Sequence, residues 1–121
     1  MITFEQYIQK FKECSIIAST VEPWEHKIIN KNFDKMKKIV QKIYEQKNEQ
    51  RFFEEIFSSN ERCVQVWGAS FSEIFDYDLR KSYEIFLEES KSSTAREIDI
   101  VGAKIAVERL EKKLNCENHN R

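Results

Sequence analysis

Apolar side chains recur every three or four residues along most of this chain, the spacing that keeps them on one face of an α-helix. The clearest run is Ile29, Phe33, Met36, Val40 and Ile43. Five lysines occupy the opposite face of the same segment: Lys27, Lys31, Lys35, Lys38 and Lys42. Two stripes on opposite faces predict an amphipathic helix over about 23–47, with Pro23 in its first turn.

The same spacing predicts five more helices, at about 3–18, 49–58, 60–75, 78–91 and 94–114. Thr3 is placed to cap the first of these, and the segment Asp76, Tyr77 and Asp78 supplies a cap for the helix at 78–91. The helix predicted at 60–75 is apolar on most sides, which favours a central position with Trp67 in the core. Short connections between successive helices predict antiparallel packing.

The last predicted helix carries an apolar set that we expect to face inward: Ile98, Val101, Ile105, Ala106, Leu110 and Leu114. A glycine inside a helix costs about 1 kcal/mol relative to alanine, so we expect a neighbouring helix to approach closely at Gly102. The chain has only two glycines and one proline, which disfavours all-β folds and phosphate-binding loops. We therefore predict an all-α, antiparallel array of about six helices. It forms one domain, 1–121, with an ordered core at about 3–114 and a frayed polar tail at 115–121.

The charge and cysteine content indicate a cytoplasmic protein. The formal net charge is −1, which predicts no general affinity for nucleic acid or acidic membranes. The three cysteines are odd in number and far apart, which is typical of reduced thiols in the cytosol. No stretch approaches the roughly 18 consecutive apolar residues of a membrane span, and no export signal begins the chain.

Side chains that could carry chemistry are few and scattered. Cys116 and His119 have the spacing of metal ligands, but a closed zinc site needs four ligands. The remaining soft candidates are Cys14, Cys63 and His26, and both cysteines fall in or beside the predicted core. Neither histidine lies near a glycine-rich turn that would present a nucleophile. The sequence therefore predicts no catalytic residue, no metal, no cofactor and no enzymatic activity.

Opposite charges are concentrated in two different regions. Residues 27–47 hold seven lysines against two acids, and residues 73–99 hold eight acids against four basic residues. One interpretation is that each helix exposes whatever makes it soluble. The other is that an acidic surface binds a basic protein partner. On this second interpretation the expected contacts are Asp76, Asp78, Glu84, Glu88 and Glu89.

The lysine face offers an alternative function as a nucleic-acid-binding adaptor. Its candidate contacts are Lys27, Lys31, Lys35, Lys38 and Lys42. Aromatic side chains are not interleaved with these lysines, which disfavours stacking on bases. Protein binding is therefore the first prediction and nucleic-acid binding the second. The sequence leaves the oligomeric state open.

Two segments carry a resemblance to a known family. The segment 29–36, with the letters INKNFDKM, is similar to an asparagine-basic-x-aromatic-aspartate-basic motif. The segment 63–69, CVQVWGA, is similar to a valine-arginine-leucine-tryptophan-alanine-alanine motif, with Gln65 in place of the arginine and Gly68 in place of an alanine. Both motifs resemble the small bacterial domain of unknown function numbered twenty-nineteen, and the likeness covers about residues 25–114.

This resemblance implies an armadillo- or HEAT-like helical array without known catalysis. Proteins similar to this family are proposed to be immunity partners of bacterial toxins. The most concrete hypothesis is therefore a cytosolic immunity protein that blocks a cognate toxin by occlusion, with a basic toxin domain as the partner.

Overall fold

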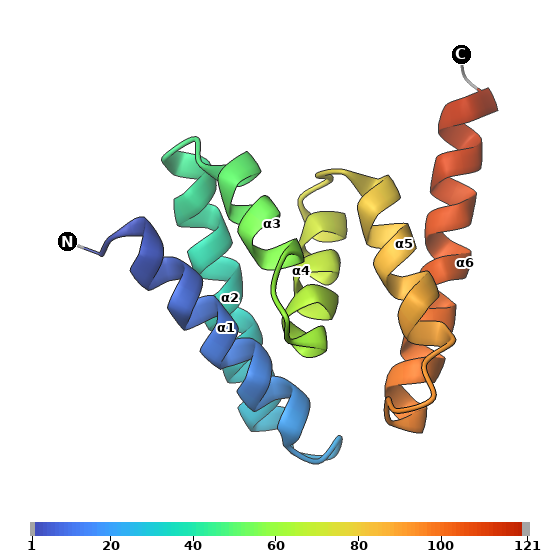
Figure 1. The fold of residues 1–121 in the computed structure, drawn as a ribbon, viewed down its shortest axis with the longest axis horizontal. Coiled ribbons are helices and arrows are strands. Elements are labelled where there is room, and N and C mark those ends of the chain that lie inside the picture. Colours follow the sequence, from blue (N-terminus) through green and yellow to red (C-terminus); the bar gives the residue numbers. More distant parts are fainter. Residues whose placement is uncertain (1, 120–121) are drawn as a thin grey trace. The chain divides into compact units, whose positions relative to one another are not determined.

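A computed structural model describes the backbone of residues 2–119 and the side chains of residues 2–115. This part of the chain forms six α-helices and no strand, which confirms the all-α prediction (Figure 1). The helices are α1 (Phe4–Thr20), α2 (His26–Glu45), α3 (Glu49–Phe57), α4 (Arg62–Ile74), α5 (Leu79–Ser90) and α6 (Glu97–His119). Within the predicted single domain the chain divides into two compact units, Met1–Phe71 and Ser72–Arg121, and the boundary falls inside α4.

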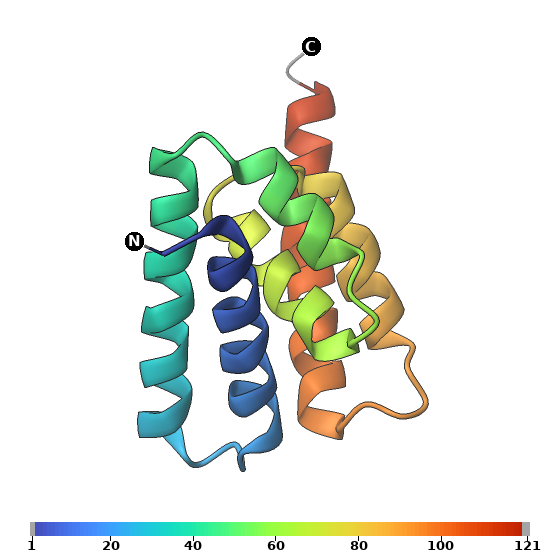
Figure 2. The ribbon, with the colours of Figure 1, turned by 60° about the vertical axis from the view of Figure 1, so that its left-hand side comes forward.

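In the first unit, α1 and α2 form an antiparallel pair (Figure 2). Thr3 caps α1 as predicted, because its Oγ1 accepts a hydrogen bond from the Gln6 amide at 3.2 Å. The Gln6 side chain in turn accepts from the Thr3 amide at 2.8 Å, which completes a capping box. The predicted start of the second helix was wrong. Pro23 belongs to a turn in which the amide of Glu25 donates to the carbonyl of Glu22 at 2.9 Å, and proline favours such a turn.

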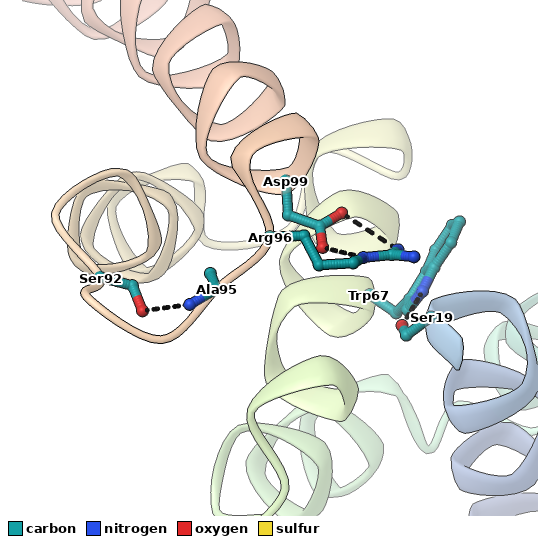
Figure 3. A network of polar contacts seen from close by, with 6 residues as sticks. All are labelled: Ser19, Trp67, Ser92, Ala95, Arg96 and Asp99. Carbon is teal, nitrogen blue, oxygen red and sulfur yellow. Dashed lines mark hydrogen bonds and ion pairs between the residues drawn. The ribbon is translucent and has the colours of Figure 1, made fainter. Parts of the chain in front are cut away.

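Aromatic rings fill the core of the first unit. Phe11 of α1 meets Phe52 of α3 edge-on, with ring centroids 5.2 Å apart. Phe71 of α4 lies 5.8 Å from Phe11 and stacks on Phe33 of α2 at 5.1 Å. Trp67 packs beside Phe33 and Phe71, and its indole Nε1 donates to Ser19 Oγ at 3.0 Å (Figure 3). Four helices thus contribute rings to one cluster, and Trp67 contacts two of these rings, although its side chain is only half-buried where the sequence predicted a core position.

The close helix approach lies at Gly68, whereas the sequence placed it at Gly102. A methyl group added to Gly68 of α4 would overlap Cγ2 of Ile56 on α3. Ile56 is fully buried, so it has no open space into which to move. Around Gly102 no atom lies within 4 Å of the position that a Cβ would take. The close-approach prediction for Gly102 was therefore wrong, because that glycine faces away from the neighbouring helix.

In the second unit, α5 packs antiparallel against α6 (Figure 2). The cap predicted within the segment 76–78 is Asp78, whose side chain accepts from the Lys81 amide at 3.3 Å. Helix α6 begins at Glu97, later than predicted. Ser92 Oγ accepts from the Ala95 amide at 3.0 Å in the preceding turn (Figure 3). At its other end α6 extends to His119, so the frayed tail predicted from residue 115 was wrong. Residues 120–121 lie outside the described part.

The inward face predicted for α6 was wrong in its first half. The buried side chains of this helix are small or aliphatic: Ala103, Ala106, Val107 and Leu110. Ile98, Val101 and Ile105 are instead 54%, 50% and 57% exposed. Apolar residues occur nearly all round α6, so their spacing fits more than one inward face. The side with the alanines packs against α5 because short side chains let two helix backbones come close.

Candidate functional site: a groove between α1 and α2

A groove of about 490 Å³ lies between α1 and α2 on the first unit. Tyr7, Lys10 and Ile17 line it from α1. These residues are spaced by three and seven positions, so they share one face of that helix. Opposite them, Lys38 and Ile39 line the groove from α2. Each helix thus turns a second, mixed face towards the groove while its other face packs into the aromatic core.

The rim of the groove is positively charged. Four lysines line it, Lys10, Lys35, Lys38 and Lys42, against the single acid Glu13. All four lysines are exposed. Lys42 forms an ion pair with Glu45 at 3.2 Å, between two well-exposed side chains. Within the described side chains, Lys10, Lys35 and Lys38 form no ion pair. Their charges are therefore available to an anionic ligand.

The floor of the groove is mainly apolar. Cys14 and Ile39 are buried among its lining residues, together with Asn32, whose side-chain amide donates a hydrogen bond to the Ile28 carbonyl at 2.9 Å. Ile17 and Ile2 are 44% and 39% exposed at its edge. Exposed isoleucines beside a concave surface provide apolar area for contact with another molecule. A ligand that fills this groove would meet apolar side chains first and ammonium groups at the margins.

Neither described cysteine is activated as a nucleophile. Burial raises the pKa of the Cys14 thiol, and the neighbouring Lys35 opposes this only in part. Burial also raises the pKa of Cys63, with the Glu61 carboxylate adding to the effect. A thiol with a raised pKa stays protonated at neutral pH and reacts slowly. The Cys14 thiol that lines the groove is therefore not activated as a nucleophile.

Metal-binding geometry is not found in the described residues, where no three His, Cys, Asp or Glu side chains come together. The side chains of the predicted pair Cys116 and His119 lie outside the described residues. Among the described helices, none combines the length and hydropathy required to cross a membrane.

The structure divides the predicted lysine face into two groups. Lys35, Lys38 and Lys42 line the groove, whereas Lys27 and Lys31 are exposed but do not. The contribution of α1 to the groove, including Lys10, was not predicted from the sequence. The pattern that could have revealed it is the spacing of Tyr7, Lys10, Cys14 and Ile17, which places these four residues on one face of α1. This face lies beside the apolar face that packs into the core.

The predicted acidic contacts all lie in the second unit, but they differ in exposure. Asp76 and Asp78 are exposed in the turn before α5, with left-handed φ values of 56° and 44°. Glu84 and Glu88 are exposed on α5. Glu89 is only 6% exposed, so its carboxylate is poorly placed to meet a partner. The other four acids remain predicted contacts.

Comparison of the chain with models of protein families, with curated proteins and with solved structures gives no match. The resemblance to the bacterial domain of unknown function therefore stays a prediction.

Proposed function

We propose that this protein is a non-enzymatic protein-binding module, and that its α1–α2 groove takes an amphipathic helix with acidic flanks from a partner protein. The observation that carries the proposal is the combination of an apolar floor with a rim of four lysines and one acid. A helix entering such a groove places apolar side chains, spaced by three or four, on the floor. Acidic residues beside them meet the lysines, which speeds association and selects the partner.

The apolar floor favours a helix over nucleic acid as the ligand. Phosphate groups would meet the lysines, but they offer nothing to cover Ile17 and Ile2. Tyr7 is the one aromatic ring among the lining residues, whereas single-strand binding uses successive rings for successive bases. An amphipathic helix with acidic flanks would cover the apolar floor and pair with the lysines of the rim.

The immunity-protein hypothesis is a more specific form of this proposal. In that form the partner is a toxin whose activity is blocked by occlusion. A helix with acidic flanks would enter the groove, and a basic surface would meet the exposed acids Asp76, Asp78, Glu84 and Glu88. The contact of the helix with the groove is expected to be the stronger of the two, because it adds buried apolar area to the charge pairing.

A labelled model peptide tests the groove directly. The peptide is a designed helix with leucines at i, i+3, i+4 and i+7 and glutamates on both flanks, and binding is followed by fluorescence anisotropy. Reversal of one rim charge, Lys38→Glu, is expected to weaken binding about 10-fold, equal to about 1.4 kcal/mol. The matched control is Lys31→Glu, which reverses a charge on the same helix outside the groove and is expected to change affinity less than about 2-fold. Absence of peptide binding to the wild type at low salt would contradict the proposal.

The second candidate, a nucleic-acid adaptor, is favoured by one observation: all five lysines of α2 named above are exposed. Phosphate contacts spread along that face predict that Lys27→Glu weakens binding to an oligonucleotide as much as Lys38→Glu does. They also predict a steep loss of affinity with salt. Groove binding predicts that only Lys38→Glu has a large effect, so the two variants separate the candidates.

A further inference from the structure

The last helix exposes an apolar ridge, which we name the α6 stripe: Ile98, Val101 and Ile105. These residues are spaced by three and four, so they form one line on the face away from Ala103, Ala106 and Val107. Gly102 lies beside the line with open space above its Cα. Each isoleucine or valine of the stripe is at least half exposed. A ridge of this kind is the form of surface that fits between two other helices.

The first two helices expose the complementary form, the α1–α2 groove. In helical arrays each helix pair buries its apolar faces against its neighbours, and the terminal pairs need polar outer faces to stay soluble. In this chain the first helix pair carries a groove with an apolar floor and a lysine rim, and the last helix carries the exposed α6 stripe. Both are uncovered within the described part of the chain.

We propose that the protein associates with itself head to tail, with the α6 stripe of one copy lying in the α1–α2 groove of the next. This inference rests on the proposed function, since it requires that the groove accept an amphipathic helix with acidic flanks. Glu97 and Glu108 lie four residues before and seven after Val101, so they flank the stripe on its own side of α6. These two carboxylates would face the lysine rim and attract it. Lys104 lies between them and would be repelled by the same rim.

The two symmetric alternatives fit the charges less well. Two grooves facing each other would bring lysine rims together. Two antiparallel stripes, centred between Val101 and Lys104, would place Glu97 of one copy against Glu108 of the other. Like charges directly opposed across an interface are unfavourable. The head-to-tail contact is heterologous, so it produces open chains or closed rings in which each interface buries one stripe and one groove.

Sedimentation velocity over a wide range of protein concentration tests the inference. The wild type is expected to grow beyond a dimer as concentration rises. Ile105→Glu breaks the stripe and Lys35→Glu/Lys38→Glu breaks the groove, so each variant alone is expected to be monomeric. An equal mixture of the two is expected to form a dimer, about twice the mass of either alone, because it retains one intact stripe and one intact groove. That dimer cannot extend.

Controls keep the test independent of folding. Ile74→Glu changes another exposed isoleucine, outside both surfaces, and is expected to associate like the wild type. A photo-crosslinking amino acid at Val101 of the otherwise unchanged chain is expected to label peptides of α1 and α2 in a second copy. Labelling of α6 instead would overturn the inference in favour of a symmetric stripe dimer.

Two further outcomes would also overturn it: a wild type that stays monomeric at the highest concentration, and a mixture of the two variants that stays monomeric. Neither outcome removes the proposed function, which fails separately if the acidic peptide does not bind the groove. Peptide binding without self-association would mean that the groove serves a different protein. Peptide binding that dissociates wild-type assemblies would support both conclusions.

Discussion

The two units of the chain are held together by different kinds of side chain. In the first unit, rings from four helices pack against one another, and Phe11, Phe52 and Phe71 are completely buried. In the second unit, the interface of α5 with α6 is built mainly from Ala, Val, Ile and Leu, with Phe86 as its buried ring. Large rings specify which face of a helix is inside, because few positions can accommodate them. Small side chains allow close packing but specify the inward face weakly.

This difference explains which helix faces each unit leaves exposed. Helices α1 and α2 each have one face committed to the ring cluster, and their other faces form the groove between them. Helix α6 has apolar residues on two sides, and only the side with the small residues meets α5. The stripe is exposed because α6 turns its two alanines, Val107 and Leu110 inward and leaves Ile98, Val101 and Ile105 on its other side. In both units the exposed apolar surface lies on helix faces that do not pack into the core.

The strongest test of the comparison truncates one core residue in each unit. Phe11→Ala is expected to destabilise the first unit by about 3–5 kcal/mol, since it removes a fully buried ring in contact with two others. Leu110→Ala removes a fully buried side chain of the second unit and is expected to cost about 2–5 kcal/mol. Both tryptophans, Trp24 and Trp67, lie in the first unit. Urea unfolding followed by tryptophan fluorescence therefore reports on that unit, and circular dichroism reports on both.

The comparison predicts that Phe11→Ala moves the fluorescence midpoint more than Leu110→Ala does. A larger fluorescence shift for Leu110→Ala would contradict the assignment of the aromatic cluster as the main core of the first unit. Coincident fluorescence and dichroism midpoints in every variant would show that the two units unfold as one cooperative element.

A smaller test makes the same substitution at both glycines. Gly68→Ala is expected to destabilise the protein by about 1–3 kcal/mol, because the new methyl group overlaps the fully buried Ile56. Gly102→Ala meets open space in a helix and is expected to stabilise it by about 0.5–1 kcal/mol. Thermal unfolding of the two variants should therefore move in opposite directions. A loss of stability in Gly102→Ala would show that the face of α6 beside the stripe is already covered in solution.

Much of the fold could be predicted from the sequence because the first unit has strong, single-sided stripes. In the second helix the apolar run and the lysines lie on opposite faces, so the inward face is unambiguous, and Met36 and Val40 are buried as expected. The caps at Thr3 and Asp78 follow from short-range hydrogen bonding, which sequence reveals directly. In α6 the same reasoning failed, because Ile105 and Val107 both lie on apolar faces and only tertiary packing decides between them.

The candidate groove was only half visible in the sequence. The lysines of α2 stand out because they repeat on one face, but their partners on α1 are Tyr7, Lys10 and Ile17, which form no pattern of one chemical type. A groove depends on which two helix faces lie side by side. That is a property of packing between elements, and the spacing within one element does not determine it.

In the second unit an ion pair joins α4 to α6. Glu73 near the end of α4 accepts two hydrogen bonds from the guanidinium of Arg109 on α6, at 2.5 and 2.6 Å. The ammonium of Lys113 lies 3.5 Å from the same carboxylate. The Glu73 side chain is 9% exposed, whereas its two partners are about half exposed. The bond from Arg109 is the main reason that the pKa of Glu73 lies below its usual value, although partial burial opposes it.

This carboxylate gives the smallest expected effect and a pH dependence of defined sign. Because the pKa of Glu73 is lower in the folded protein, its ion pair adds stability above the unfolded pKa of about 4.3, and loses it as pH falls through the folded pKa. Glu73→Gln is expected to cost about 1 kcal/mol at pH 7, and the difference from wild type should shrink steadily below about pH 4.3. The matched control is Glu84→Gln, an exposed acid of α5, with an expected effect under about 0.5 kcal/mol. Urea unfolding at pH 7 and pH 3 measures both variants. A Glu73→Gln deficit that persists unchanged at pH 3 would mean that the side chain matters for its shape and hydrogen bonding, and that charge pairing does not hold α4 to α6.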